Sequence, residues 1–377
     1  MRGHLTERRP GVWRITISDG FDDAGQRRRI TRTVTGSKRD AGRELTRLLR
    51  ERDEGTLADG RQPLSAYLSD EWLGEVSAVS KRGRPLAPTT RQRYADAAGH
   101  VSRVIGRVRL MDLRTSHVVK LRDRLLAEGT LAPQTISDVL RVLSQALSKA
   151  EAKGYVGKNV ASAQLVNRPV GDRPSFDVIG AAKAAKILEA VQGADPWDVA
   201  VHLALGLGLR REEVLALPWD DVDDAVHVRR TLTYAGGEIH FGPPKSAAGE
   251  RDLPIPDFVG RALRRHRAAQ AERLLMIGMQ PELVVDNGIG EPWLPASFST
   301  GWRRFAAAHG FDGITFHTLR HGAATLLLAG GVSDAVAIKL MGHADTKILR
   351  RYQEVVDELQ RDAAGRMDKL LGGELRG

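Results

Sequence analysis

The first part of the chain alternates apolar and polar side chains in two short stretches. VWRITIS (12–18) and RRITRTVT (28–35) are rich in β-branched residues and have the period of two that is typical of half-buried strands. The segment between them supplies turn residues, and Ser37 is the expected N-cap of a following amphipathic helix. The apolar face of that helix consists of Ala41, Leu45, Leu48 and Leu49. We therefore predict a small β-rich N-terminal module over residues 1–58.

Helical spacing of apolar residues replaces this alternation over residues 63–165. Four helices are predicted, beginning near Leu64, after Pro88, after Ser116 and near Ile136. The clearest apolar face, at i, i+3 and i+4 spacing, consists of Ile136, Val139, Leu140, Leu143 and Leu147. The following segment, LVNRPVGDRPSF (165–176), contains two prolines and a glycine and is expected to be a linker.

Residues 175–377 are predicted to form a third domain, which is mostly helical with a short β insertion. VHVRRTLTY (226–234) and EIHF (238–241) are the expected strands, and a loop leads from them to RDLPI. The expected fold class is therefore mainly α with small β elements (α+β).

The charge of the chain favours a nucleic-acid partner. Its 377 residues include 57 Lys plus Arg and 47 Asp plus Glu, a net charge of +10. Residues 1–50 hold 13 basic and 6 acidic residues, so this stretch alone carries +7. A basic surface attracts the phosphate backbone of DNA and releases its counterions.

Other features of the composition exclude several classes of protein. The chain has no cysteine, which excludes disulfides, thiolate metal sites and thiol nucleophiles. No apolar run approaches the roughly 18 residues of a membrane span. The first residues, MRGHLTERRPG, lack the apolar region of a secretory signal. We expect a cytoplasmic protein with no membrane partner.

Clusters of arginine are candidates for DNA contact, although charged runs also occur on ordinary solvated surfaces. Both interpretations stay open for the second predicted strand and for the helical domain. The residues concerned are Arg27, Arg28, Arg29, Arg32, Arg91 and Arg93.

The first candidate for chemistry is Arg210, which lies between two apolar helical stretches. Gly206 and Gly208 precede it and allow a tight turn, and Glu213 follows three residues later. Lys245 is the second candidate, because it is the only lysine between Lys186 and Lys339 in a region that otherwise uses arginine. Lysine can lose a proton near neutral pH, whereas arginine cannot.

His317 and Arg320 are three residues apart at the start of a predicted helix and therefore share a face. His317 and His321 also have the spacing of a metal-binding pair. A zinc site is disfavoured, because the segment has no HExxH glutamate and no clear third ligand.

The last candidates are His343, which follows Gly342, and Tyr352, nine residues further on. Arginines can hold phosphate oxygens, a tyrosine can attack phosphorus, and histidine and lysine can move protons. In their order and spacing, GLRREEVLAL, Lys245, FHTLRH and LMGHADTKILRRYQ resemble the motifs of the tyrosine recombinases of the phage integrase family. Methionine stands in the last motif where leucine is commoner, a substitution that conserves volume.

The resemblance implies a set of roles. Tyr352 would attack the scissile phosphate to give a 3′-phosphotyrosine, and Lys245 would protonate the leaving 5′-oxygen. Arg210, supported by Glu213, and Arg320 would stabilise the charged transition state. His317 would assist proton transfer, and His343 would donate a hydrogen bond to the phosphate.

The resemblance also implies domain functions and partners. No cofactor or metal would be needed, since the covalent link conserves the energy of the phosphate bond. The N-terminal module would bind arm-type DNA, and the helical region would be the core-binding domain. The partners would be double-stranded attachment sites of a phage or other mobile element and further copies of the chain, as a tetramer on DNA. A directionality factor or a host DNA-bending protein is a further partner in this setting.

Two other functions stay open at this stage. A nicking-closing enzyme of the type IB topoisomerase kind has the same catalytic residue types and would relax any supercoiled plasmid. A DNA-binding regulator on an inactive recombinase scaffold would bind DNA without cutting it, but the complete residue set argues against it.

Overall fold

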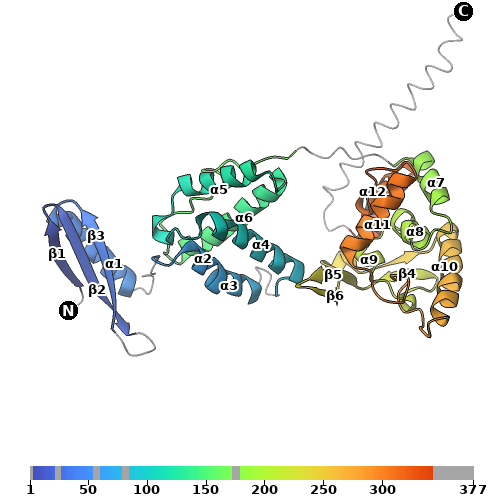
Figure 1. The fold of residues 1–377 in the computed structure, drawn as a ribbon, viewed down its shortest axis with the longest axis horizontal. Helices are drawn as coiled ribbons and strands as arrows, with labels where there is room; N and C mark the ends of the chain where they lie inside the picture. Colours follow the sequence, from blue (N-terminus) through green and yellow to red (C-terminus); the bar gives the residue numbers. More distant parts are fainter. Residues whose placement is uncertain (1–2, 22–26, 54–59, 79–84, 172–178, 343–377) are drawn as a thin grey trace, which may run out of the picture. The chain divides into compact units, whose positions relative to one another are not determined.

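The computed structural model describes residues 3–21, 27–53, 60–78, 85–171 and 179–342 (Figure 1). The chain divides into two compact units, Met1–Arg173 and Pro174–Gly377. None of the described helices is long and apolar enough to cross a membrane.

A three-stranded antiparallel sheet forms the N-terminal part of the first unit. Strands β1 (Gly3–Arg9), β2 (Val12–Phe21) and β3 (Arg27–Thr35) pair in the order β1-β2-β3, and α1 (Lys38–Asp53) packs on them (Figure 1). The core between sheet and helix is small and is built on the buried side chains Ile15, Ile17 and Leu48.

Strand β1 was not expected from the sequence. Its seven residues, GHLTERR, include one large apolar side chain, Leu5, so the alternation that marks a strand is almost absent. The strand lies at an edge of the sheet, where β2 alone supplies its pairing partners. Backbone pairing with β2 therefore specifies this strand more than its own side chains do.

The rest of the described part of the first unit is helical. A first helix runs through α2 (Leu64–Ala66), a π-helical segment (Tyr67–Trp72) and α3 (Leu73–Ala78). The helices that follow are α4 (Pro88–Ile105), α5 (Thr115–Glu128) and α6 (Pro133–Ala152), with a 3₁₀ turn at Leu110–Asp112. The predicted apolar face of α6 is buried, from Ile136 to Leu147, in a core shared with the other helices.

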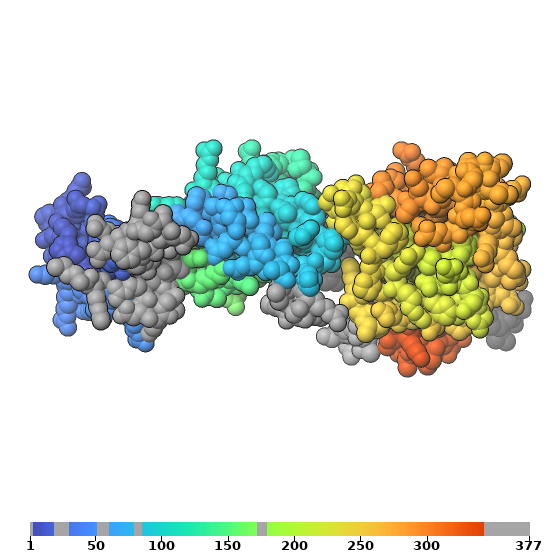
Figure 2. All heavy atoms as spheres, turned by 90° about the horizontal axis from the view of Figure 1, so that it is seen from below, coloured from blue at the N-terminus to red at the C-terminus, as the bar shows by residue number. Residues whose placement is uncertain are grey.

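The second unit is also mainly helical, with two small sheets. Its helices are α7 (Ala181–Ala190), α8 (Trp197–Val201), α9 (Arg211–Val214), α10 (Asp257–Leu275), α11 (Pro295–Ala308), α12 (Phe316–Ala329) and α13 (Asp334–Met341). A π-helical segment (His202–Gly206) extends α8, and 3₁₀ turns occur at Trp219–Asp221 and Ala247–Gly249. The described atoms of this unit, coloured yellow-green to red, form one closely packed body in the space-filling view (Figure 2).

The β elements of this unit differ from the prediction in one respect. The expected single strand over residues 226–234 is wrong, because the structure divides it into β4 (Ala225–Val228) and β5 (Thr231–Ala235). Strand β4 pairs with β7 (Arg251–Pro254), whereas β5 forms a hairpin with β6 (Glu238–Gly242). Val226 and Val228 of β4 and Leu232 of β5 are all buried in the main core, so both strands are anchored there although they pair with different neighbours.

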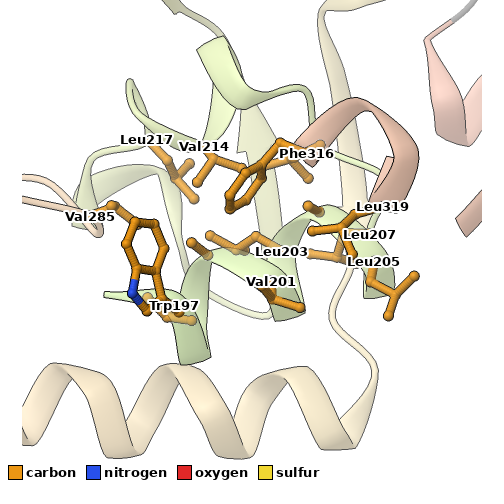
Figure 3. Close-up of a cluster of buried hydrophobic side chains, with 14 of the residues drawn as sticks. Trp197, Val201, Leu203, Leu205, Leu207, Val214, Leu217, Val285, Phe316 and Leu319 are labelled. Atoms are coloured by element: carbon orange, nitrogen blue, oxygen red, sulfur yellow. The ribbon is translucent and has the colours of Figure 1, made fainter. Parts of the chain in front are cut away.

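The core of the second unit joins the elements that carry the candidate residues. Side chains from the α8 region, α9 and α12 converge there, among them Leu203, Val214, Phe316 and Leu319 (Figure 3). All four are essentially buried. Phe316 and Leu319 of α12 are buried in the same core as Val214 of α9. The polar residues that adjoin them in sequence therefore lie at the same end of this core.

Candidate active site

Arg210 occupies the N-cap position of α9 and is fixed by Glu213. The Arg210 backbone N–H donates to Glu213 Oε2 at 2.9 Å, and Arg210 Nη1 donates to Glu213 Oε1 at 2.5 Å. A carboxylate at this position also matches the positive end of the helix dipole. The i, i+3 pair expected from the sequence is therefore present, and it orients the Arg210 guanidinium.

Glu213 is buried, with 2% of its surface exposed, and it binds a second arginine. Arg251 donates from Nη1 to Glu213 Oε1 at 3.1 Å and from Nη2 to Oε2 at 2.9 Å. Burial alone would raise the pKa of the Glu213 carboxyl. The hydrogen bonds from Arg251 and the charges of Arg251 and Arg210 outweigh that effect, so the pKa of Glu213 lies below its usual value.

Three arginines bind three successive carbonyl oxygens at the C-terminal end of α13. Arg251 Nε donates to Leu340 O at 2.7 Å, Arg320 Nη2 donates to Met341 O, and Arg210 Nη2 donates to Gly342 O at 2.9 Å. The last carbonyls of a helix have no partner within the helix. Arg210, Arg320 and Arg251 supply those partners, so the end of α13 is hydrogen-bonded to two predicted site residues and to the arginine that shares Glu213 with Arg210.

Arg320 is buried and lies against the glycine turn that precedes α9. Its Nη1 donates to the carbonyl of Gly208. Gly208 has a left-handed φ of +67°, and a Cβ there would lie 2.5 Å from Met341 Sδ. The predicted tight turn is thus required both by backbone conformation and by the close approach of α13.

His317 lies at the start of α12, beside Arg320, and its side chain is exposed. Partial desolvation by the surrounding protein lowers the pKa of the His317 imidazole, and the charge of Arg320 lowers it further. The charge of Glu212 raises this pKa and that of Arg210 lowers it. The neutral ring is therefore favoured near neutral pH, and a neutral imidazole can accept a proton.

Arg210, His317 and Arg320 line one cleft of about 560 Å³. The remaining lining residues come from the starts of α9 and α12 and from α11, and they are Arg211, Glu212, Ser299, Trp302, Arg303, Thr315 and Phe316. Four arginines with one histidine make this cleft suited to an anion such as a phosphodiester.

Lys245 lies in the loop between β6 and β7, as expected, and its side chain is exposed. It is not among the residues that line the cleft. His343 and Tyr352 lie outside the described residues, so their predicted roles stay predictions.

The described residues provide no group of side chains that would complete a metal site with His317 and His321. Their rings contact each other edge to face, with centroids 4.1 Å apart. Within the described part of the chain, no group of three or more His, Cys, Asp or Glu side chains could hold a metal ion.

The candidate DNA-contacting arginines differ in their surroundings. Arg91 and Arg93 lie exposed on α4. Arg32 of β3 is partly neutralised, because its Nη1 lies 3.3 Å from Glu44 Oε1. Arg27, Arg28 and Arg29 begin β3, but their side chains lie outside the described part.

Two groups of residues at the site were not predicted. Ser299 and Trp302 of α11 form one wall of the cleft, and Ser299 Oγ accepts a hydrogen bond of 2.7 Å from Arg211 Nη1. Arg251 is the other omission. In β7 its side chain shares the buried face with Leu253, and this alternation is the one sequence signal for an inward side chain. The alternation does not identify Glu213 as its partner.

Known proteins are similar to this chain in sequence. Residues 179–358 match the phage integrase family. A "Tyrosine recombinase XerC-like" protein of Caldanaerobacter subterraneus subsp. tengcongensis is 24% identical over 388 residues, which cover 95% of this chain and 96% of the relative.

Solved structures share the fold. The Tn1549 transposon integrase in complex with a circular intermediate DNA has a TM-score of 0.65 at 18% identity, over 80% of this chain and 99% of that one. A lambda integrase tetramer bound to a Holliday junction has a TM-score of 0.57 at 20% identity, over 92% and 94% of the two chains. At these identities the likeness establishes the fold alone. The family match covers the residues that carry the cleft, so this part of the chain is similar to the tyrosine recombinases of the phage integrase family.

Proposed function

We propose that this chain is a site-specific DNA recombinase that integrates a phage or other mobile element. The observation that carries the proposal is the cleft in which Arg210, Arg320 and His317 meet, because two guanidiniums and a neutral imidazole suit phosphoryl transfer. Relatives named integrase and tyrosine recombinase support it.

The proposed reaction is a transesterification. The hydroxyl oxygen of Tyr352 attacks the scissile phosphorus and loses its proton to His317, while the bond to the 5′-oxygen breaks and Lys245 protonates that oxygen. Arg210 and Arg320 stabilise the charge on the pentacoordinate phosphorus, and His343 donates to the same phosphate. The 5′-hydroxyl of a partner strand then displaces the tyrosine, so no free energy source is consumed.

The binding of Gly342 O by Arg210 supports the inclusion of His343 in this set. Gly342 immediately precedes His343, and its carbonyl lies 2.9 Å from Arg210 Nη2. The residue immediately before His343 is therefore bound to a side chain that lines the cleft.

The proposed partners are double-stranded attachment sites and further copies of the chain. Lambda integrase, a structural neighbour, forms a tetramer bound to a Holliday junction, and we propose a tetramer on DNA for this chain as well. Residues 1–58 would bind arm-type DNA, residues 63–165 would bind the core site, and residues 175–377 would carry out catalysis. A directionality factor or a host DNA-bending protein would assist, and the cytoplasm, where the host DNA lies, would be the place of action.

Tyr352→Phe tests the nucleophile. The substrate is a nicked duplex that carries the attachment core identified in the DNA flanking the gene, and denaturing electrophoresis detects a covalent adduct. The variant should bind this duplex but form no adduct, since phenylalanine lacks the attacking oxygen. Tyr234→Phe is the matched control, because Tyr234 is exposed on β5, and it should keep full activity.

A plasmid-relaxation assay and the adduct assay together separate the alternative functions. Relaxation of a supercoiled plasmid without an attachment site would favour a topoisomerase. Binding of the core duplex without any adduct from the unaltered chain would favour an inactive regulator. An adduct that persists in Tyr352→Phe would place the nucleophile elsewhere.

A further inference from the structure

Arg251 is a buried cation whose role is not explained by phosphate binding. It is the first residue of β7, only 6% of its surface is exposed, and it is not among the residues that line the cleft. Burying a guanidinium is costly unless its donors have partners. The identity of those partners therefore indicates what Arg251 does.

The first partner is the carboxylate that orients Arg210. Both Nη atoms of Arg251 donate to the two oxygens of Glu213, at 3.1 and 2.9 Å, in the parallel fork that arginine forms with carboxylates. Any movement of Arg251 would therefore move Glu213, and Arg210 with it.

The second partner is the end of α13. Arg251 Nε donates to Leu340 O at 2.7 Å. Gly342 caps the helix with a φ of +59°, and a Cβ there would lie 3.1 Å from Arg251 Nη1 and 2.8 Å from Ala248 O. The end of α13 thus packs directly against the Arg251 side chain and against the loop that precedes Arg251.

The third partner is the loop that carries Lys245. Arg251 Nη1 also donates to Gly249 O at 2.9 Å. A Cβ at Gly249 would lie 2.5 Å from Pro244 Cβ, so the loop is folded tightly back on the residue that precedes Lys245. One side chain therefore holds the end of this loop to Glu213.

We propose that Arg251 is a positioning residue that keeps the Lys245 loop and the C-terminal end of α13 in fixed register with Arg210. Replacing it displaces the proton donor and the C-terminal end of α13 together, without removing a group that contacts the phosphate. The inference rests on the proposed recombinase function.

Arg251→Lys is the test variant. Lysine keeps the positive charge beside Glu213, but its single nitrogen lacks the planar fork and cannot bind Glu213, Leu340 O and Gly249 O in the same way. Arg273→Lys is the matched control. Arg273 lies in the same unit, is not among the residues that line the cleft and likewise binds carboxylates and a carbonyl. Its Nη1 pairs with Asp195, its Nη2 lies 2.6 Å from Asp286 Oδ1, and its Nε lies 3.0 Å from Gly288 O.

The assay compares two nicked duplexes of the attachment core, one with the natural 5′-oxygen and one with sulfur at that bridging position. Sulfur is a better leaving group and needs little protonation. Arg251→Lys should cleave the oxygen substrate about 10²-fold more slowly, the loss typical of a misplacement of about 1 Å, with unchanged DNA affinity. On the sulfur substrate the loss of cleavage rate should be roughly tenfold smaller, because this substrate bypasses the displaced proton donor and nothing else.

A loss that is equal on the two substrates, or that Arg273→Lys reproduces, would overturn the inference and leave Arg251 with a role in stability alone. A wild-type chain that forms no adduct on either substrate would overturn the proposed function, and the positioning role would fall with it.

Hydrogen exchange of the free protein provides a measurement that needs no substrate. Arg251→Lys should increase amide exchange at the end of α13 and in the loop 243–250, and Arg273→Lys should leave both segments unchanged. Unaltered exchange in these two segments of Arg251→Lys would contradict the proposed coupling.

Discussion

Glu213→Gln is the perturbation whose size can be worked out most directly from the structure. The Glu213 carboxylate accepts four hydrogen bonds, from Arg210 N and Nη1 and from Arg251 Nη1 and Nη2. A glutamine side chain keeps one acceptor oxygen. Its –NH₂ group replaces the other oxygen and faces the two donors that this oxygen accepted from. Two guanidiniums then share a buried site without a negative charge.

Breaking a buried ion pair in this way costs about 3–5 kcal/mol. For a unit of this size, each kcal/mol lowers the melting temperature by roughly 2–4 °C, so the expected shift is on the order of 6–20 °C. Thermal unfolding followed by circular dichroism measures it. Glu212→Gln is the matched control, because its side chain is 35% exposed and pairs with Arg211 near the surface, and it should cost less than about 1 kcal/mol.

The pH dependence gives a second check on the same variant. Because the folded-state pKa of Glu213 lies below the ordinary value of 4.5, its ionisation contributes stability that is fully present above that pH. This stability is lost as pH falls through the folded-state pKa. The difference between wild type and Glu213→Gln should therefore be largest near neutral pH and shrink below 4.5. Equal melting shifts for Glu213→Gln and Glu212→Gln, or a difference that does not change with pH, would refute the reasoning.

Three further outcomes are expected. Lys245→Ala should lose cleavage of the ordinary phosphodiester by about 10²–10⁴-fold and regain it on the 5′-bridging sulfur substrate, and no selective recovery would remove Lys245 from the acid role. Gly208→Ala should lower thermal stability by about 1–3 kcal/mol because of its left-handed φ and the contact with Met341, whereas Gly193→Ala, with φ +75° and open space, should cost less. Deleting residues 1–58 should keep core-site binding but reduce recombination of long sites in a plasmid assay, and equal recombination by both forms would exclude arm binding.

Local spacing predicts two pairings within the candidate site, whereas the choice of its residues depended on the order of the motifs along the chain. Arg210 with Glu213, and His317 with Arg320, are pairs three residues apart, and helical geometry alone brings each pair together. Arg251 could not be predicted, because its role depends on the pairing of β7 with β4 across more than twenty residues of sequence. The division of residues 226–234 into β4 and β5 has the same origin. The partner of each strand, and not its own composition, sets where it ends.

The binding of three arginines to the end of α13 also determines the charge and the order of the site in the absence of DNA. Guanidiniums gathered in one place repel each other, and an empty anion site is normally unstable for that reason. Here the Glu213 carboxylate pairs with Arg210 and Arg251. The C-terminal end of α13, which carries partial negative charge, lies against all three arginines and adds to this resident counter-charge. The cation cluster is therefore preorganised without a bound phosphate. DNA meets electrostatic groups that are already oriented, so little reorganisation energy has to be supplied when the strand is cut.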